Sequence, residues 1–84
     1  MEIKKGVFKI IRIIGDKKEA YVREIIKESK MSASTVVNRL KELEKEGFVT
    51  SYRKKIRNFY RKYYKLTDKG RKLYIMTKVF GYYF

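Results

Sequence analysis

The chain has 84 residues, the length of one small domain, and carries 23 Lys and Arg against 9 Asp and Glu, a formal net charge of +14. It contains no Cys and no His, which excludes disulfides, thiolate nucleophiles and the commonest metal ligands and general bases. Hydrophobic residues make up 44%, too many for a disordered tail, and no uncharged stretch exceeds eight residues, too few to span a bilayer. We therefore expect one soluble, cytoplasmic domain over residues 1–84 that binds a polyanion.

Spacing of apolar residues predicts two helices in the first third of the chain. The first is predicted over residues 3–14 and is ended by Gly15 and Asp16. A connector follows at 17–20, with a short strand as an option, and a helix of about two turns is predicted over 21–29.

A third helix is predicted over residues 33–46. Ser32 is its expected N-cap, because a serine hydroxyl accepts a hydrogen bond from a free amide of the first turn. Gly47 is its expected C-terminal stop. Val36, Leu40 and Leu43 line one face, which we expect to be buried.

The next segment predicts a β-hairpin over residues 48–66, with a five-residue tip at 54–58. Tyr64 and Leu66 are expected to face the core, and Tyr63 to face outward. Thr67 can cap a last helix over 68–80. The order of elements predicts an α+β, mostly helical domain.

The positive charge is concentrated in the hairpin. Residues 1–49 carry 12 basic and 8 acidic side chains, whereas residues 50–72 carry 10 basic side chains and one acid. A charge run is often only a solvated face, but here we expect nothing nearby to neutralise it, which favours anion binding. Aromatic residues alternate with the cations and are expected mostly to cover the core, with stacking on unpaired bases as the alternative.

The second and third helices, joined by a short turn, match a helix-turn-helix. Opposite Leu40, the outer face of the third helix is polar, and its first half is the part that enters a major groove. Asn38 suits bidentate contact with adenine, although such residues are also ordinary caps and solvated positions. The candidate DNA contacts on this helix are Ser32, Ser34, Thr35, Asn38, Arg39 and Lys41.

The string MSASTVVNRLKELEKEGFV at 31–49 and the string YYKLTDKG at 63–70 resemble winged helix-turn-helix transcription regulators of the MarR, PadR and ArsR kind. With VREI at 22–25, the resemblance covers about residues 19–73. It implies base and phosphate contacts from the third helix and phosphate or minor-groove contacts from the hairpin, the wing. The candidate wing contacts are Arg53, Lys54, Lys55, Arg57, Asn58 and Arg61. The chain lacks the long extra helices of many relatives and any Cys or His sensor, so no small-molecule effector is evident.

The last twelve residues carry a single charge, so the last helix is apolar nearly all round. We expect it to pack against a second copy, which suits DNA with two half-sites; the alternative is a helix folded back on its own domain. The candidate dimer contacts are Leu73, Met76, Phe80 and Tyr83.

The function expected from these features is a sequence-specific, double-stranded DNA-binding regulator, a homodimeric repressor associated with the nucleoid. One alternative is an archaeal chromatin-type architectural protein with little sequence preference, and another is a winged-helix module that binds RNA or protein. These functions differ in their preference for one DNA sequence over random duplex and in the salt dependence of binding, so both measurements would distinguish them. Catalysis, cofactors and metals are not expected, because the Glu residues pair with nearby cations rather than converge. The absence of Pro, Cys, His, Gln and Trp is typical of thermophilic proteins.

Overall fold

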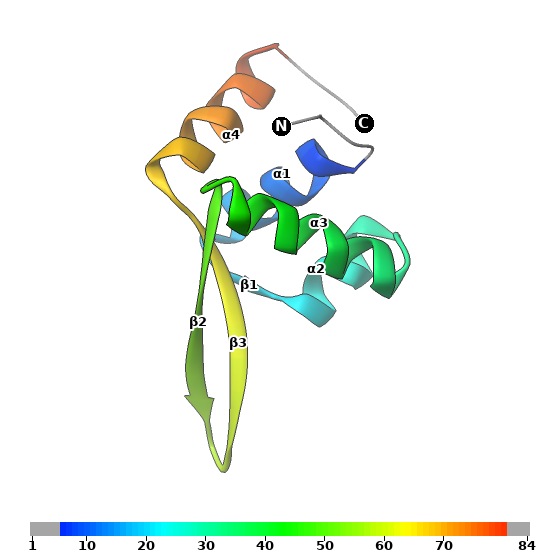
Figure 1. The fold of residues 1–84 in the computed structure, drawn as a ribbon, viewed down its shortest axis with the longest axis vertical. Helices are drawn as coiled ribbons and strands as arrows, with labels where there is room; N and C mark the ends of the chain where they lie inside the picture. The colour runs from blue at the N-terminus through cyan, green and yellow to red at the C-terminus, as the bar shows by residue number, and fades with distance from the viewer. Residues whose placement is uncertain (1–5, 81–84) are drawn as a thin grey trace.

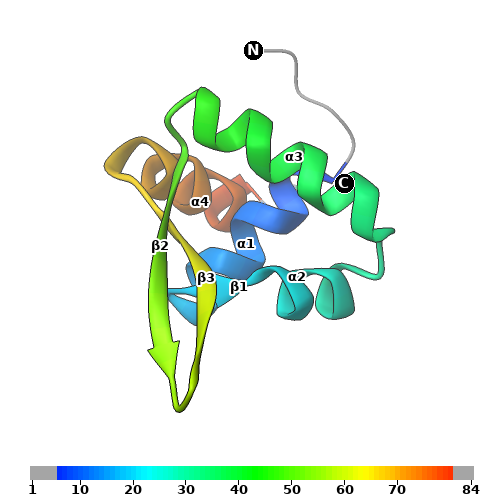
Figure 2. The same cartoon turned by 60° about the horizontal axis from the view of Figure 1, so that its bottom comes forward.

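The computed structural model describes residues 6–80, with Phe80 described by its backbone alone. The elements, in chain order, are α1 (Val7–Lys17), β1 (Ala20–Tyr21), α2 (Val22–Ser29), α3 (Ala33–Lys45), β2 (Val49–Ile56), β3 (Phe59–Leu66) and α4 (Asp68–Phe80). Figures 1 and 2 show the helices packed together and the β2–β3 hairpin projecting beyond them as a long ribbon. The fold is a winged helix of the α+β class, as expected.

Three of the four helices lie where the sequence predicts them, but the bounds of the first were wrong. The described part of α1 begins at Val7, because Gly6 has a φ of 89° and cannot be helical, and it continues through Gly15 to Lys17. Residues 3–5 lie outside the described residues. A Cβ on Gly15 would overlap the ring of Tyr74 in α4. This glycine therefore permits close helix packing and does not end the helix, which ends at Lys17, before Lys18 with its φ of 70°.

The short strand considered for the connector is real and lies at Ala20–Tyr21. It makes the wing part of a three-stranded antiparallel sheet with the order β1-β3-β2. Ala20 pairs with Tyr64 in β3, and β3 pairs in turn with β2 from Val49↔Leu66 to Ile56↔Phe59. The base of the wing is therefore fixed to the helical body on one side by β1.

The predicted five-residue tip was wrong, because the strands continue almost to the end of the hairpin. The ladder reaches Ile56↔Phe59, which leaves a two-residue turn of Arg57 and Asn58. Arg57 has a φ of 56°, the sign that tight two-residue hairpin turns require. Lys54 and Lys55 consequently lie on a regular strand with defined faces instead of in a loop.

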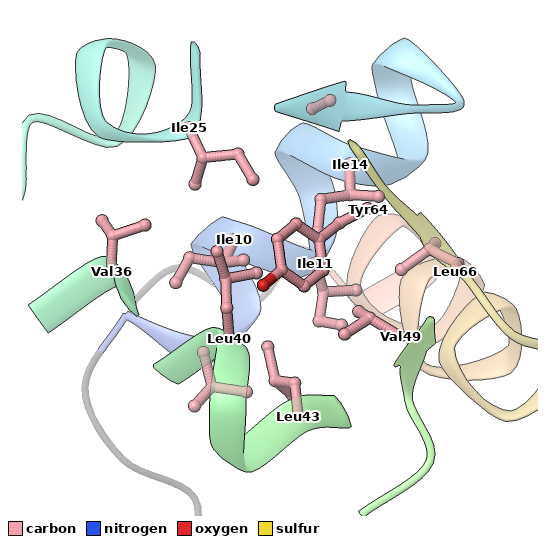
Figure 3. Packing of buried hydrophobic residues seen from close by; sticks show 12 residues of the cluster. Ile10, Ile11, Ile14, Ile25, Val36, Leu40, Leu43, Val49, Tyr64 and Leu66 are labelled. Carbon is pink, nitrogen blue, oxygen red and sulfur yellow. The ribbon is translucent and has the colours of Figure 1, made fainter. Parts of the chain in front are cut away.

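The core is built around α1 and is shown in Figure 3. Tyr64 and Leu66 face it, as predicted, at 5% and 8% exposure. Leu73 and Tyr74 of α4 pack against it from outside. Its buried members are Val7, Ile10, Ile11, Ile14, Ala20, Ile25, Val36, Leu40, Leu43, Val49, Tyr64 and Leu66.

The junction of α3, the wing and α4 is closed by backbone hydrogen bonds. Gly47 ends α3 with a φ of 80°: its N–H donates to Glu44, and the N–H of Phe48 donates to Leu43 at 2.8 Å, the pattern of a Schellman motif. Thr67 caps α4, as predicted, by accepting a hydrogen bond from the N–H of Gly70. Its hydroxyl donates to the carbonyl of Gly47, and its N–H donates to that of Phe48. The angle between α3 and the wing is thereby set at this junction.

No helix within residues 6–80 is long and apolar enough to cross a membrane.

Candidate nucleic-acid interface

The N-terminus of α3 is capped as the sequence predicts. The Oγ of Ser32 accepts a hydrogen bond from the backbone N–H of Thr35 at 3.2 Å and donates one to the hydroxyl of Thr35 at 2.8 Å. Ser32 is exposed and Thr35 is half-buried, so both serve the cap first. Ser34 is exposed, and its hydroxyl lies 3.4 Å from that of Ser32. These hydroxyls form a polar surface around the free amides of the first turn.

Farther along α3, the predicted contact residues face away from the core. Asn38 and Lys41 are exposed, whereas Leu40 between them is 1% exposed. Arg39 is half-buried, and its guanidinium lies 3.1 Å from the carboxylate of Glu42. The helix therefore presents Asn38 and Lys41 outward and holds Arg39 along its flank.

Most cations of the wing lie at exposed positions on its strands or in its turn. Arg53, Lys55 and Arg57 are exposed, and within residues 6–80 none of them forms an ion pair with a carboxylate. Arg61 is half-buried, with its guanidinium 4.1 Å from the ring centre of Tyr21. Asn58 is exposed in the turn. Most of the positive charge of the wing thus faces solvent without compensation.

One acid does neutralise part of the wing, contrary to the sequence prediction. Glu19, in the connector after α1, lies 2.8 Å from the ammonium of Lys54 and accepts a hydrogen bond from the hydroxyl of Tyr52. The hydrogen bonds from Lys54 and, second, from Tyr52 hold the pKa of Glu19 below its ordinary value, and that of Lys54 is raised by the same bond. Lys54 is therefore tied to the body of the protein by an ion pair.

Tyr63 was predicted to face solvent, but it is only 9% exposed. It does lie on the outer face of the sheet, where its ring is stacked with Tyr52 at 5.9 Å and meets Tyr21 edge-on at 5.5 Å. The register explains the cluster, because Tyr63 pairs with Tyr52 on one side and Tyr21 on the other. Sequence reasoning missed Tyr21 and Glu19, since only the pairing of β1 with β3 brings them to the wing.

The aromatic residues of β3 divide into two groups. Tyr63 and Tyr64 are buried at the base of the wing, whereas Phe59 and Tyr60 beside the turn are 50% and 59% exposed. The prediction that these aromatics cover the core is correct for Tyr64 alone, because Tyr63 is buried on the outer face of the sheet. It is wrong for Phe59 and Tyr60, because β3 extends beyond the helices at its tip (Figure 1).

The predicted dimer contacts on α4 also divide. Leu73 is half-buried and packs against the core of its own chain. Met76 is 51% exposed and lies beside Ile75 and Val79, at 54% and 71%. Tyr83 and the side chain of Phe80 lie outside the described residues. One face of α4 therefore closes the domain, and another is apolar and open.

A comparison with protein-family models identifies residues 4–55 as a match to the MarR family. The chain belongs to the MarR family. The match spans α1 to most of β2, and so includes the helix-turn-helix and the start of the wing. The resemblance inferred from residues 31–49 is thereby confirmed.

Solved structures of MarR-type and related regulators share this fold. Streptococcus pneumoniae FabT in complex with DNA superposes with a TM-score of 0.83 at 26% identity, over 95% of this chain and 55% of FabT. The transcriptional regulator YodB from B. subtilis has a TM-score of 0.81 at 25% identity, over 93% of this chain and 76% of YodB. A PadR family regulator from Clostridium difficile has a TM-score of 0.76 at 27% identity, over 88% and 84%.

This MarR-family chain spans just over half the length of FabT. No curated protein sequence matches it significantly.

Proposed function

We propose that the protein is a sequence-specific, double-stranded DNA-binding transcription regulator. The first half of α3 enters the major groove, and the wing lies along phosphates and the adjacent minor groove. Membership of the MarR family supports this assignment, as does the similarity to FabT, which was solved in complex with DNA. Binding to DNA also implies a cytoplasmic, nucleoid-associated location.

The observation that carries the proposal is the combination of an outward polar helix and an uncompensated basic ribbon. Asn38 and Lys41 project from α3, and Arg53, Lys55 and Arg57 project from the wing without carboxylate partners in the described chain. A strand of eight residues is about 26 Å long at about 3.3 Å per residue, so the wing extends well past the end of the helices. One domain can then contact bases and more distant phosphates at the same time.

Base reading is assigned to Asn38, and backbone positioning to the cations. An exposed amide on the groove-facing side of a recognition helix suits the N6 and N7 edge of adenine. Lys and Arg on an exposed ribbon neutralise phosphates and give affinity without sequence information. Ser34 and the amides of the first turn of α3 add a phosphate contact at the helix N-terminus.

A homodimer is the second part of the proposal. Ile75, Met76 and Val79 form an apolar surface on α4 that the described residues leave more than half exposed. Pairing of this surface with its own copy removes it from water and presents two α3 helices to two half-sites about one helical turn apart. Val79→Asp is expected to shift sedimentation toward monomer, whereas Lys72→Asp, on an exposed position of the same helix, is not. Unchanged sedimentation of Val79→Asp would exclude this surface.

The deciding experiment is selection of bound duplexes from random DNA, followed by competition. A specific dimer yields a palindromic motif and prefers it over random duplex by about 10³-fold or more. Absence of a motif together with a steep salt dependence would indicate an architectural protein instead. Displacement of the duplex by structured RNA would indicate an RNA-binding module.

A further inference from the structure

The outermost end of the wing carries aromatic side chains where phosphate binding requires only cations. Phe59 and Tyr60 follow the turn directly and are 50% and 59% exposed, whereas the other wing aromatics are buried or half-buried. Contact with a partner would remove this aromatic surface from water, which is favourable. The tip therefore has a surface that the domain itself does not use.

Both faces of the tip combine a ring with a cation. Side chains alternate along a strand, so Phe59 and Tyr60 project from opposite faces of β3. The guanidinium of Arg61 lies 5.4 Å from the ring centre of Phe59, and that of Arg53 lies 5.2 Å from that of Tyr60. A nucleic acid is the partner that best matches flat apolar rings beside positive charge, because it offers bases and sugars beside phosphates.

The dimensions of the hairpin decide how it meets a duplex. A sheet with side chains on both faces is about 10 Å thick, whereas the minor groove of B-DNA is about 6 Å wide. The turn residues Arg57 and Asn58 alone fit an undistorted groove. Entry of the rings that follow the turn requires the groove to widen, which unstacks base pairs and bends the duplex.

We propose that Phe59 and Tyr60 form a wedge that widens the minor groove under each wing and bends the DNA. With such a wedge, binding depends on how easily the DNA under the wing deforms. Flexible pyrimidine–purine steps at that position are therefore favoured over stiff A-tracts. This inference rests on the proposed function, because it requires that the protein binds duplex DNA.

The test compares the wild-type protein with the double variant Phe59→Ala/Tyr60→Ala and with Lys55→Ala. Energy transfer between the duplex ends measures the bend, and 2-aminopurine fluorescence at the wing position measures unstacking. The wild-type protein is expected to bend the selected site and to prefer a TA step over an A-tract there by about tenfold. The double variant, which keeps every cation, is expected to lose the bend and this preference and to retain the salt slope. Lys55→Ala is expected to lower the salt slope by about one and to keep the bend.

The two proposals fail in different ways. If the double variant bends and discriminates steps like the wild type while both bind duplex tightly, the wedge is overturned and the proposed function stands. If the wild-type protein binds single-stranded DNA more tightly than duplex and the double variant does not, the rings contact unpaired bases, and the wedge proposal is also overturned. If the wild-type protein binds no duplex, the proposed function fails and the wedge falls with it. Circular dichroism of both variants checks the fold, which we expect to be unchanged because the substituted side chains are exposed.

Discussion

Replacement of Gly70 by Ala is the sharpest test of how α3, the wing and α4 are joined. A Cβ at this position would overlap the carbonyl oxygen of Phe48 and lie 3.0 Å from its carbonyl carbon and 3.3 Å from a methyl group of Leu66. The obstacle is backbone, so a rotamer change cannot remove it. The same carbonyl accepts a hydrogen bond from the N–H of Thr67 at 3.1 Å, and Thr67 in turn caps the N–H of Gly70 at 3.1 Å.

The expected cost follows from these contacts. Forcing a methyl group into packed backbone costs about 1–3 kcal/mol. Loss of the Thr67–Phe48 hydrogen bond costs about 1 kcal/mol, and a weakened cap up to about 1 kcal/mol. Alanine returns about 1 kcal/mol through its higher helix propensity. We therefore expect Gly70→Ala to lower the free energy of unfolding by about 1–4 kcal/mol, and Tm by about 4–8 °C for each kcal/mol in a domain of this size.

Thermal and urea unfolding followed by circular dichroism measure the effect, with two control variants. Arg71→Ala, next in the same helix and exposed, is expected to change the free energy of unfolding by less than about 0.5 kcal/mol. Gly47→Ala meets no atom within 4 Å in the described chain but keeps a φ of 80°, so it is expected to cost only the strain of that conformation, about 1–2 kcal/mol. A Gly70→Ala variant as stable as Arg71→Ala would refute the close approach.

Three further predictions concern the interface. Asn38→Ala is expected to cost about 1–3 kcal/mol of binding at the preferred site and to relax specificity there; an unchanged ranking of sites in competition assays would remove Asn38 from base reading. Joint replacement of Lys54, Lys55 and Arg57 by Ala is expected to weaken binding to every duplex and to flatten the salt slope by about one for each lost phosphate contact, as measured by titration at several salt concentrations. Glu19→Gln is expected to weaken the loss of stability at acid pH. The folded-state pKa of Glu19 lies below its ordinary value near 4.5. The ionised carboxylate therefore contributes to the free energy of unfolding above that pH, and this contribution is lost as the pH falls through the folded pKa. If Tm falls with pH in the same way for the wild-type protein and Glu19→Gln, the carboxylate has no such role.

Features that depend on neighbouring residues were predictable from the sequence. The cap at Ser32, the stop at Gly47 and the cap at Thr67 each involve partners within five residues, and each is confirmed. The outward position of Asn38 follows from the helical period alone once Leu40 is taken as buried. These local rules determine the helix-turn-helix, which is why the family was evident from a short string.

Features that depend on pairing between distant segments were not predictable. Glu19 meets Tyr52 and Lys54 across 33 and 35 residues, and nothing near Glu19 marks it as a wing residue. The burial of Tyr63 required the register of β3 against both neighbours. The extra length of β2 was missed because a run of Lys and Arg is a poor strand signal, yet both faces of a projecting ribbon are solvated and accept such residues.

The last turn of α1 and the connector to β1 join the two parts of the proposed function. Asp16 accepts a hydrogen bond from Tyr74 in α4, Lys17 lies 2.7 Å from the carboxylate of Glu28 in α2, and Glu19 holds the wing. Exposed pairs of this kind are each worth little energy, but all three start within residues 16–19, at the end of α1, the central helix of the core. The proposed dimer surface on α4 and the wing are therefore both held against the end of α1. The half-site spacing of a selected operator should then be fixed by the packing of α1 on α4, with little freedom in the wing.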